Sequence, residues 1–147
     1  MIKILLKKID IPEKLPEDMK TVIEELKHSK NKEDCLRKAY MLLTSKYRGY
    51  RIKTYLRLFD IFFIDINKIW KKTGFLNCII LNYLLRILLI KSEFFKEEDI
   101  QIKLSMVWFI SPHQYLNIRT EKNKTINIDI WGKSYGIKYG DYARGFH

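Results

Sequence analysis

The chain has 147 residues, of which 47% are hydrophobic and 14% aromatic, and its formal net charge is +11 at pH 7. This length suits one domain with its own hydrophobic core, and the apolar content excludes disorder over most of the chain. The two cysteines are too few for a disulfide framework and lack the spacing of a zinc site, which favours a reducing compartment.

The first residues, MIKILLKKID, contain an apolar stretch too short for the core of a signal peptide. The later apolar segment from Cys78 to Ile90 contains Arg86 and is shorter than the roughly 20 residues needed to cross a bilayer. We therefore expect no membrane span and a cytoplasmic location. The positive charge would suit nucleic acid or an anionic membrane, but no basic stripe or nucleic-acid motif concentrates it. We favour a solvated lysine-rich surface and expect no specific nucleic-acid partner.

Two amphipathic helices are predicted after an extended lead-in at residues 1–16. The first begins near Pro16 and carries an apolar stripe with helical spacing, formed by Met19, Val22, Ile23 and Leu26. The second follows Asn31, which suits an N-cap with Asp34 three residues later. Its buried stripe is Leu36, Ala39, Tyr40, Leu43 and Tyr47.

Residues 52–70 are apolar and aromatic at helical spacings, which predicts a helical segment with a kink where Asp65 restarts the helix and an end at Gly74. The segment CIILNYLLRILLI then predicts a helix at the centre of the core, because apolar residues lie on nearly all its sides. Asn77 suits its N-cap, and it runs to about residue 92. Asn82 and Arg86 follow Cys78 at four-residue steps, so the three side chains share one face.

Three strands are predicted next, at residues 100–110, 113–119 and 125–131, with a tail of turns and loops after them. The loop TEKNKT joins the second and third strands as a hairpin. We therefore predict an α+β fold in which N-terminal helices and a central Cys-bearing helix pack on a small antiparallel sheet. The single domain 1–147 would comprise the lead-in, a helical part at 17–71 and a catalytic core at 72–147.

Cys78, His113 and Asp129 occur in an order and in elements that suit a catalytic triad. A hairpin turn centred near Glu121 would place His113 directly opposite Asp129, with Cβ atoms about 4.5–5.5 Å apart. A shift of the apex by one or two residues would make the pair diagonal but still within reach. Asp129 lies on the strand face opposite to Ile126, Ile128 and Ile130.

The chemistry assigns a role to each residue. Cys78 would be the nucleophile, with its thiolate favoured by the helix N-terminus and by His113 as imidazolium. His113 would move protons, and Asp129 would orient the imidazole. The backbone N–H of Cys78 would stabilise the oxyanion, with Trp70 and Asn82 as candidates for the second donor or for positioning. We expect no cofactor and no metal, since the remaining histidines, His28 and His147, have no ligand-like neighbours.

The stretches TGFLNCIILNYLLRILLIKS, SPHQYLNI and TINIDIWG resemble the transglutaminase-like superfamily of papain-related cysteine enzymes. Members commonly show a cysteine at a helix start, a histidine leading one strand and an aspartate in the next. The resemblance covers about residues 70–140. It implies a transglutaminase-like core and an acyl-enzyme thioester formed on amide bonds, in peptide hydrolysis, deamidation or acyl transfer to an amine, with a peptide or protein substrate. Members often have glycine soon after the Cys helix, where this chain has Glu93.

Two other hypotheses remain open from the sequence. The first keeps the fold without the chemistry, as a transglutaminase-like scaffold that binds a peptide or protein; a missing oxyanion donor or a blocked cleft would favour it. The second is a basic nucleic-acid-binding protein, which rests on charge and tyrosine content. Steep salt dependence of DNA or RNA binding would favour that hypothesis.

Overall fold

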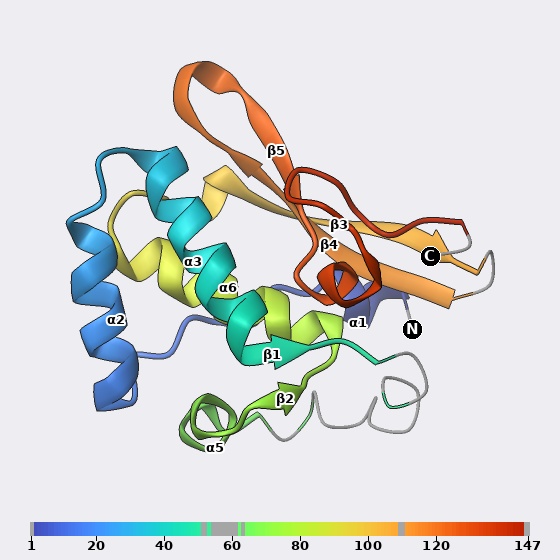
Figure 1. Cartoon of the computed structure of the whole chain (residues 1–147), viewed down its shortest axis with the longest axis horizontal. Coiled ribbons are helices and arrows are strands. Elements are labelled where there is room, and N and C mark those ends of the chain that lie inside the picture. The colour runs from blue at the N-terminus through green and yellow to red at the C-terminus, as the bar shows by residue number, and fades with distance from the viewer. Residues whose placement is uncertain (1, 51–52, 54–61, 63, 109–110, 146–147) are drawn as a thin grey trace.

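The computed structural model describes the whole chain except residues 1, 51–52, 54–61, 63, 109–110 and 146–147. The described residues form an α+β arrangement with helices packed against a three-stranded antiparallel sheet, as predicted (Figure 1). No helix in this part of the chain is both long and apolar enough to cross a bilayer.

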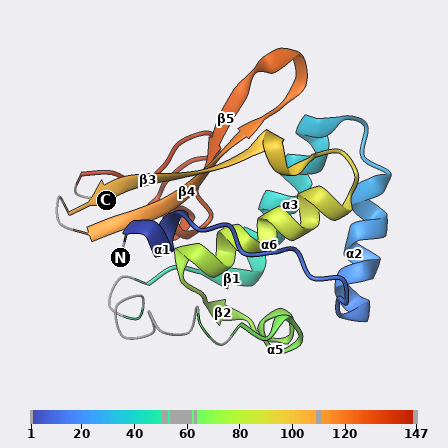
Figure 2. The ribbon, with the colours of Figure 1, turned by 180° about the vertical axis from the view of Figure 1, so that it is seen from behind.

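The N-terminal lead-in is not extended throughout, because Ile2–Leu6 forms the short helix α1. One helical turn lets Leu5 become buried against the core, while Ile4 and Leu6 remain 45% and 46% exposed. From Lys7 to Pro16 the chain has no regular helix or strand. Figure 2 shows this segment running along the central helix towards the next helix.

The next two helices are α2 (Glu17–Lys27) and α3 (Lys32–Lys46), close to their predicted bounds. The predicted stripes are buried except at Val22, which is half-buried. Tyr47 is buried just beyond the end of α3, and Cys35 is buried within the helix. Asn31 caps α3 by accepting a hydrogen bond from the Asp34 N–H at 2.8 Å. The Asp34 carboxylate accepts from the Lys30 N–H, one residue before the position that a capping box uses.

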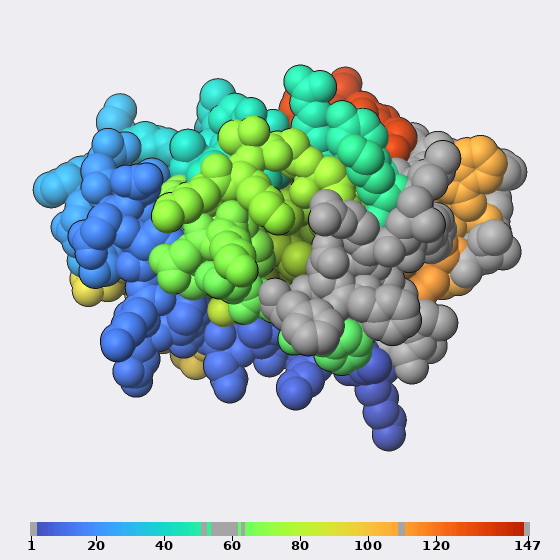
Figure 3. Space-filling model, turned by 90° about the horizontal axis from the view of Figure 1, so that it is seen from below, coloured from blue at the N-terminus to red at the C-terminus, as the bar shows by residue number. Residues whose placement is uncertain are grey.

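The helical segment predicted for 52–70 is confirmed only at its end, since most of it lies outside the described residues. Asp65 restarts a helix as predicted, accepting from the N–H groups of the first turn of α5 (Ile66–Lys71). The helix ends before Gly74, which belongs instead to β2 (Gly74–Phe75). This strand pairs in parallel with β1 (Tyr47–Arg48). In Figure 3 the green atoms of α5 and β2 occupy the middle of one face and adjoin the blue atoms of α2.

The central helix α6 (Cys78–Lys91) is buried on all sides, as its sequence predicts. Asn77 caps it by accepting from the Ile80 N–H at 2.9 Å. The helix packs against α3 on one side and β4 on the other. After its C-cap, Ser92, the chain turns at Glu93 with φ 71°, a left-handed conformation that favours glycine.

The main sheet has the order β3-β4-β5, formed by Ile100–Val107, Ser111–Arg119 and Thr125–Ile128. The β4–β5 hairpin projects beyond the helices (Figure 1). The third strand is shorter than predicted, because a 3₁₀ helix at Trp131–Tyr135 turns the chain away from the sheet. Two further 3₁₀ turns, Glu97–Asp99 and Glu121–Asn123, precede β3 and form the hairpin tip.

Candidate active site

Cys78 lies at the first position of α6, where a helix leaves its N–H groups without intrahelical acceptors. The residue is 7% exposed, whereas the other cysteine, Cys35, is completely buried in α3. Burial raises the pKa of the Cys35 thiol, and its sulfur lies 3.4 Å from the Ser92 hydroxyl in the core. Only Cys78 therefore combines a helix N-terminus with residual access to solvent.

His113 and Asp129 are joined by a hydrogen bond of 2.7 Å between Nε2 and Oδ2. His113 is on β4, and Asp129 directly follows β5. Strand pairing sets Leu116 opposite Ile128, so His113 and Asp129 are diagonal neighbours. The prediction that they lie directly opposite is therefore wrong, and the diagonal alternative is the one the strand register adopts.

The register differs because the hairpin apex is one residue later than predicted. Lys122 and Asn123 both adopt positive φ, 57° and 60°, and complete the turn between the strands. This centres the turn on Lys122 rather than on Glu121. Diagonal neighbours remain within reach of a ring and a carboxylate, which preserves the contact.

The Asp129 carboxylate is fixed from three sides. Its Oδ1 accepts from the Gly132 N–H at 2.8 Å, and its Oδ2 accepts from the Ala143 N–H at 2.8 Å as well as from His113. The residue is 2% exposed. Two main-chain N–H groups thus hold the Asp129 carboxylate in the orientation in which it meets His113.

Two glycines allow the close packing around this carboxylate. A Cβ at Gly132 would lie 2.7 Å from Asp129 Oδ2, nearer than real Cβ contacts come. A Cβ at Gly49 would lie 2.5 Å from the Trp131 indole. That indole in turn packs on the imidazole of His113, with ring centroids 4.9 Å apart. Glycine at both positions therefore brings the ring and the carboxylate together.

The electrostatics of the site favour a charged imidazole. Burial is the largest single influence on the pKa of His113 and lowers it, while the charge and the hydrogen bond of Asp129 both raise it. A hydrogen bond and a charge interaction with Cys78 add to this, and the pKa of His113 rises from 6.5 to about 10. His113 is therefore held as imidazolium at neutral pH.

Cys78 also acts on this imidazole, since it raises the pKa of His113 through a hydrogen-bond interaction and through its charge. This influence places Cys78 near the ring, whose hydrogen bond of 2.7 Å is to Asp129. Because Asp129 occupies Nε2, the ring nitrogen left for the sulfur is Nδ1. The structure thus brings together a sulfur, an imidazole and a carboxylate from three elements that are distant in the sequence.

Of the two candidates for positioning or a second oxyanion donor, Asn82 supports the strand that carries His113. Its Nδ2 donates to the main-chain oxygen and to Oε1 of Gln114, both at 3.0 Å. Gln114 is the residue next to His113 on β4, and its own amide donates to the Leu5 carbonyl. Both N–H groups of Asn82 are thereby engaged, which favours a positioning role over that of an oxyanion donor.

Trp70 lies in α5 and contacts the end of α3. The Lys46 ammonium is 3.7 Å from the centroid of the Trp70 indole and donates to the Trp70 main-chain oxygen. The indole therefore packs under a cation. A role for Trp70 as an oxyanion donor stays a prediction.

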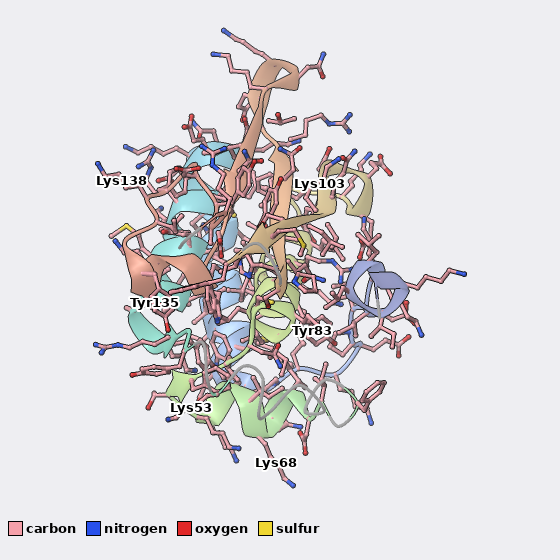
Figure 4. The ribbon with its side chains drawn as sticks, turned by 90° about the vertical axis from the view of Figure 1, so that its right-hand side faces the viewer. Lys53, Lys68, Tyr83, Lys103, Tyr135 and Lys138 are labelled. Carbon is pink, nitrogen blue, oxygen red and sulfur yellow. The ribbon has the colours of Figure 1, made fainter. Side chains whose placement is uncertain are left out.

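The segment after β5 contributes two main-chain N–H groups to the site, those of Gly132 and Ala143, that were not predicted. Figure 4 shows where this segment runs, since its residues Tyr135 and Lys138 are labelled there, on the side of the molecule opposite α1. The Gly132 contact had a local signal, because a glycine three residues after an aspartate suits an Asp side chain that bonds its own backbone. The Ala143 contact had no local signal in the sequence, because its bond to Asp129 joins residues 14 apart through tertiary packing.

No protein-family model, no curated protein and no solved structure matches this chain. Over the described ranges, no group of three or more His, Cys, Asp or Glu side chains is arranged to hold a metal ion. The case for a function therefore rests on the geometry of Cys78, His113 and Asp129.

Proposed function

We propose that this chain is a thiol-dependent amide-bond enzyme with a transglutaminase-like core, acting as a cysteine peptidase, deamidase or acyltransferase through Cys78, His113 and Asp129. One observation carries the proposal. A buried imidazole is bonded to a buried carboxylate at 2.7 Å and interacts with a cysteine at the start of a helix. These are the parts that convert a thiol into a nucleophile near neutral pH.

The first chemical step would form a thioester. The Cys78 sulfur attacks the amide carbon, and the carbonyl π electrons move onto oxygen to give a tetrahedral oxyanion. The Cys78 N–H at the helix start would donate to this oxyanion. When the intermediate collapses, the C–N bond breaks and His113 gives its proton to the leaving nitrogen, so the amine departs neutral.

The second step would release the acyl group. Water or an amine attacks the thioester carbon and passes a proton to the now neutral His113. The C–S bond then breaks, and the electron pair returns to sulfur, which restores the thiolate beside the imidazolium. Attack by water completes hydrolysis or deamidation, and attack by an amine completes acyl transfer.

Asp129 would act by orientation through both steps. Its main-chain hydrogen bonds to Gly132 and Ala143 hold the carboxylate still while the imidazole gains and loses a proton. A neutral imidazole that donates from Nε2 to Asp129 presents an unprotonated Nδ1 towards the sulfur. The tautomer needed for the next proton transfer is therefore the one that Asp129 selects.

A thiol-labelling experiment tests the proposal. Limiting iodoacetamide should alkylate Cys78 much faster than Cys35, read by peptide mass spectrometry. His113→Ala should slow the labelling of Cys78 by about tenfold or more, because the thiolate loses its imidazolium partner. His28→Ala is the matched control, since His28 is exposed and lies at the end of α2.

The outcomes separate the enzyme from a binding scaffold. Slow and equal labelling of both cysteines in the folded protein would contradict the proposal and leave the inactive scaffold as the better account of the fold. Unchanged labelling in His113→Ala would contradict it as well. Circular dichroism of each variant identifies any loss of folding that would expose both cysteines together.

A further inference from the structure

The side chain of Asn77 has one polar group that the fold does not use. Its Oδ1 accepts from the Ile80 N–H at 2.9 Å and caps α6. Its Nδ2 is buried and has no hydrogen-bond partner among the described residues. The whole residue is only 2% exposed. Buried polar groups without a partner are rare in folded proteins, so each one calls for an explanation.

Helix capping does not explain this amide nitrogen. An N-cap needs an oxygen acceptor, and serine, threonine or aspartate would supply one without burying an unused N–H₂ group. The orientation of the amide is also fixed. Rotating it by 180° would set the N–H₂ donors against the Ile80 N–H donor and lose the cap.

The position of the group is specific. Asn77 directly precedes Cys78, and the bond to Ile80 holds its amide over the first turn of α6. The Cys78 N–H emerges at the same end of the helix. Asn77 and Cys78 thus supply two N–H donors at the N-terminal end of α6, where the helix dipole favours negative charge.

We infer that Nδ2 of Asn77 is the second donor of the oxyanion hole, an assignment that rests on the function proposed above. When the Cys78 sulfur attacks a carbonyl carbon, the negative charge that develops on oxygen accepts one hydrogen bond from the Cys78 N–H and one from Asn77. The unpartnered donor is thus a preorganised group that receives its partner as the oxyanion forms. Asn82 is less suited, because both of its N–H groups are engaged by Gln114.

Two electrophiles distinguish this role from a structural one. p-Nitrophenyl acetate acylates a thiolate through a tetrahedral oxyanion, whereas iodoacetamide alkylates it by displacement at a saturated carbon and forms no oxyanion. Asn77→Ser keeps the capping oxygen and removes the amide donor. We expect it to slow acylation of Cys78 by about 100-fold, with the rate of alkylation changed by less than about twofold.

The matched control is Asn31→Ser at the N-cap of α3, where the asparagine also accepts from an N–H three residues later. This variant should leave both rates unchanged. Asn77→Thr is the second variant at the site, because it retains a capping oxygen if the serine variant folds poorly. Circular dichroism establishes folding before either rate is compared.

The outcomes are separable from those that test the triad. If the wild-type protein acylates and alkylates Cys78 no faster than Cys35, the proposed function fails. If the wild type reacts with both probes but folded Asn77→Ser slows them equally, or slows neither, the assignment of Asn77 is overturned while the triad stands. A selective loss of acylation in both Asn77 variants supports it.

Discussion

Protonation of His113 should make the stability of the fold depend on pH. The pKa of the imidazole is raised from 6.5 to about 10 in the folded protein. A raised pKa stabilises the folded state fully below pH 6.5, and the contribution is lost as the pH rises through about 10. The free energy of unfolding should therefore decline across the neutral and mildly alkaline range.

The change is best measured in a Cys78→Ser background, which removes the thiol beside the imidazole and retains Asp129, the stronger of the two influences that raise the pKa of His113. With His113 as the titrating group and Asp129 as its partner, the free energy of unfolding should fall by about 2 kcal/mol between about pH 6.5 and pH 8. This figure depends mainly on the unfolded pKa, since the folded group stays protonated over the whole interval.

The assay is urea denaturation followed by circular dichroism at several pH values, with the double variant Cys78→Ser/His113→Gln as reference. Subtracting the reference removes the contributions of all other titrating groups. The subtracted curve should slope downwards towards high pH. Parallel curves for the two variants would show that His113 does not hold a proton above its ordinary pKa, and the electrostatic account of the site would fail.

Two further predictions concern the backbone around the site. Gly132→Ala should destabilise the fold by about 1–3 kcal/mol and slow alkylation of Cys78, because its Cβ would displace the Asp129 carboxylate; unchanged labelling would contradict the role of that carboxylate. Glu93→Gly should stabilise the fold by about 0.5–1 kcal/mol in urea denaturation, because glycine relieves a left-handed φ at the end of α6. Lys91→Gly, at the last helical position, should destabilise it and serves as the control.

Local signals in the sequence predicted the parts of the fold that local forces build. Asn31, Asp65 and Asn77 are caps in the structure as predicted, because a side-chain oxygen next to free helical N–H groups acts within a few residues. The apolar face of α2 followed from helical spacing, and the all-round burial of α6 followed from apolar residues on nearly all its sides. Cys78 at the start of its helix was therefore located correctly before any tertiary contact was known.

Interactions between distant segments were beyond such reasoning. The end of β5 was misplaced because Asp129 turns back to Gly132 and to Ala143, and the second of these contacts depends on the path of the tail. The centre of the β4–β5 turn was predicted one residue too early, at Glu121 instead of Lys122, because the turn depends on which residues adopt positive φ. The short helix α1 was not predicted, because one buried leucine in five residues forms no repeating apolar pattern.

The polar face of α6 explains how a mostly apolar helix holds Cys78 at the right distance from His113. Hydrophobic packing is non-directional, so it would allow α6 to slide along β4. Asn82 prevents this by binding the main chain of Gln114, the neighbour of His113.

One turn further along, Arg86 donates to the Ile9 carbonyl at 2.9 Å and to both carboxylate oxygens of Glu97 at 2.9 and 3.2 Å. Tyr83, labelled in Figure 4, donates to the Asp10 carbonyl on the same N-terminal segment. A buried polar side chain that loses its partner pays a desolvation penalty, so each bond resists any shift of the helix. The face that begins with Cys78 thus also fixes the position of Cys78, and a shift of α6 that separated its sulfur from the imidazole would have to break the bonds of Asn82 and Arg86 together.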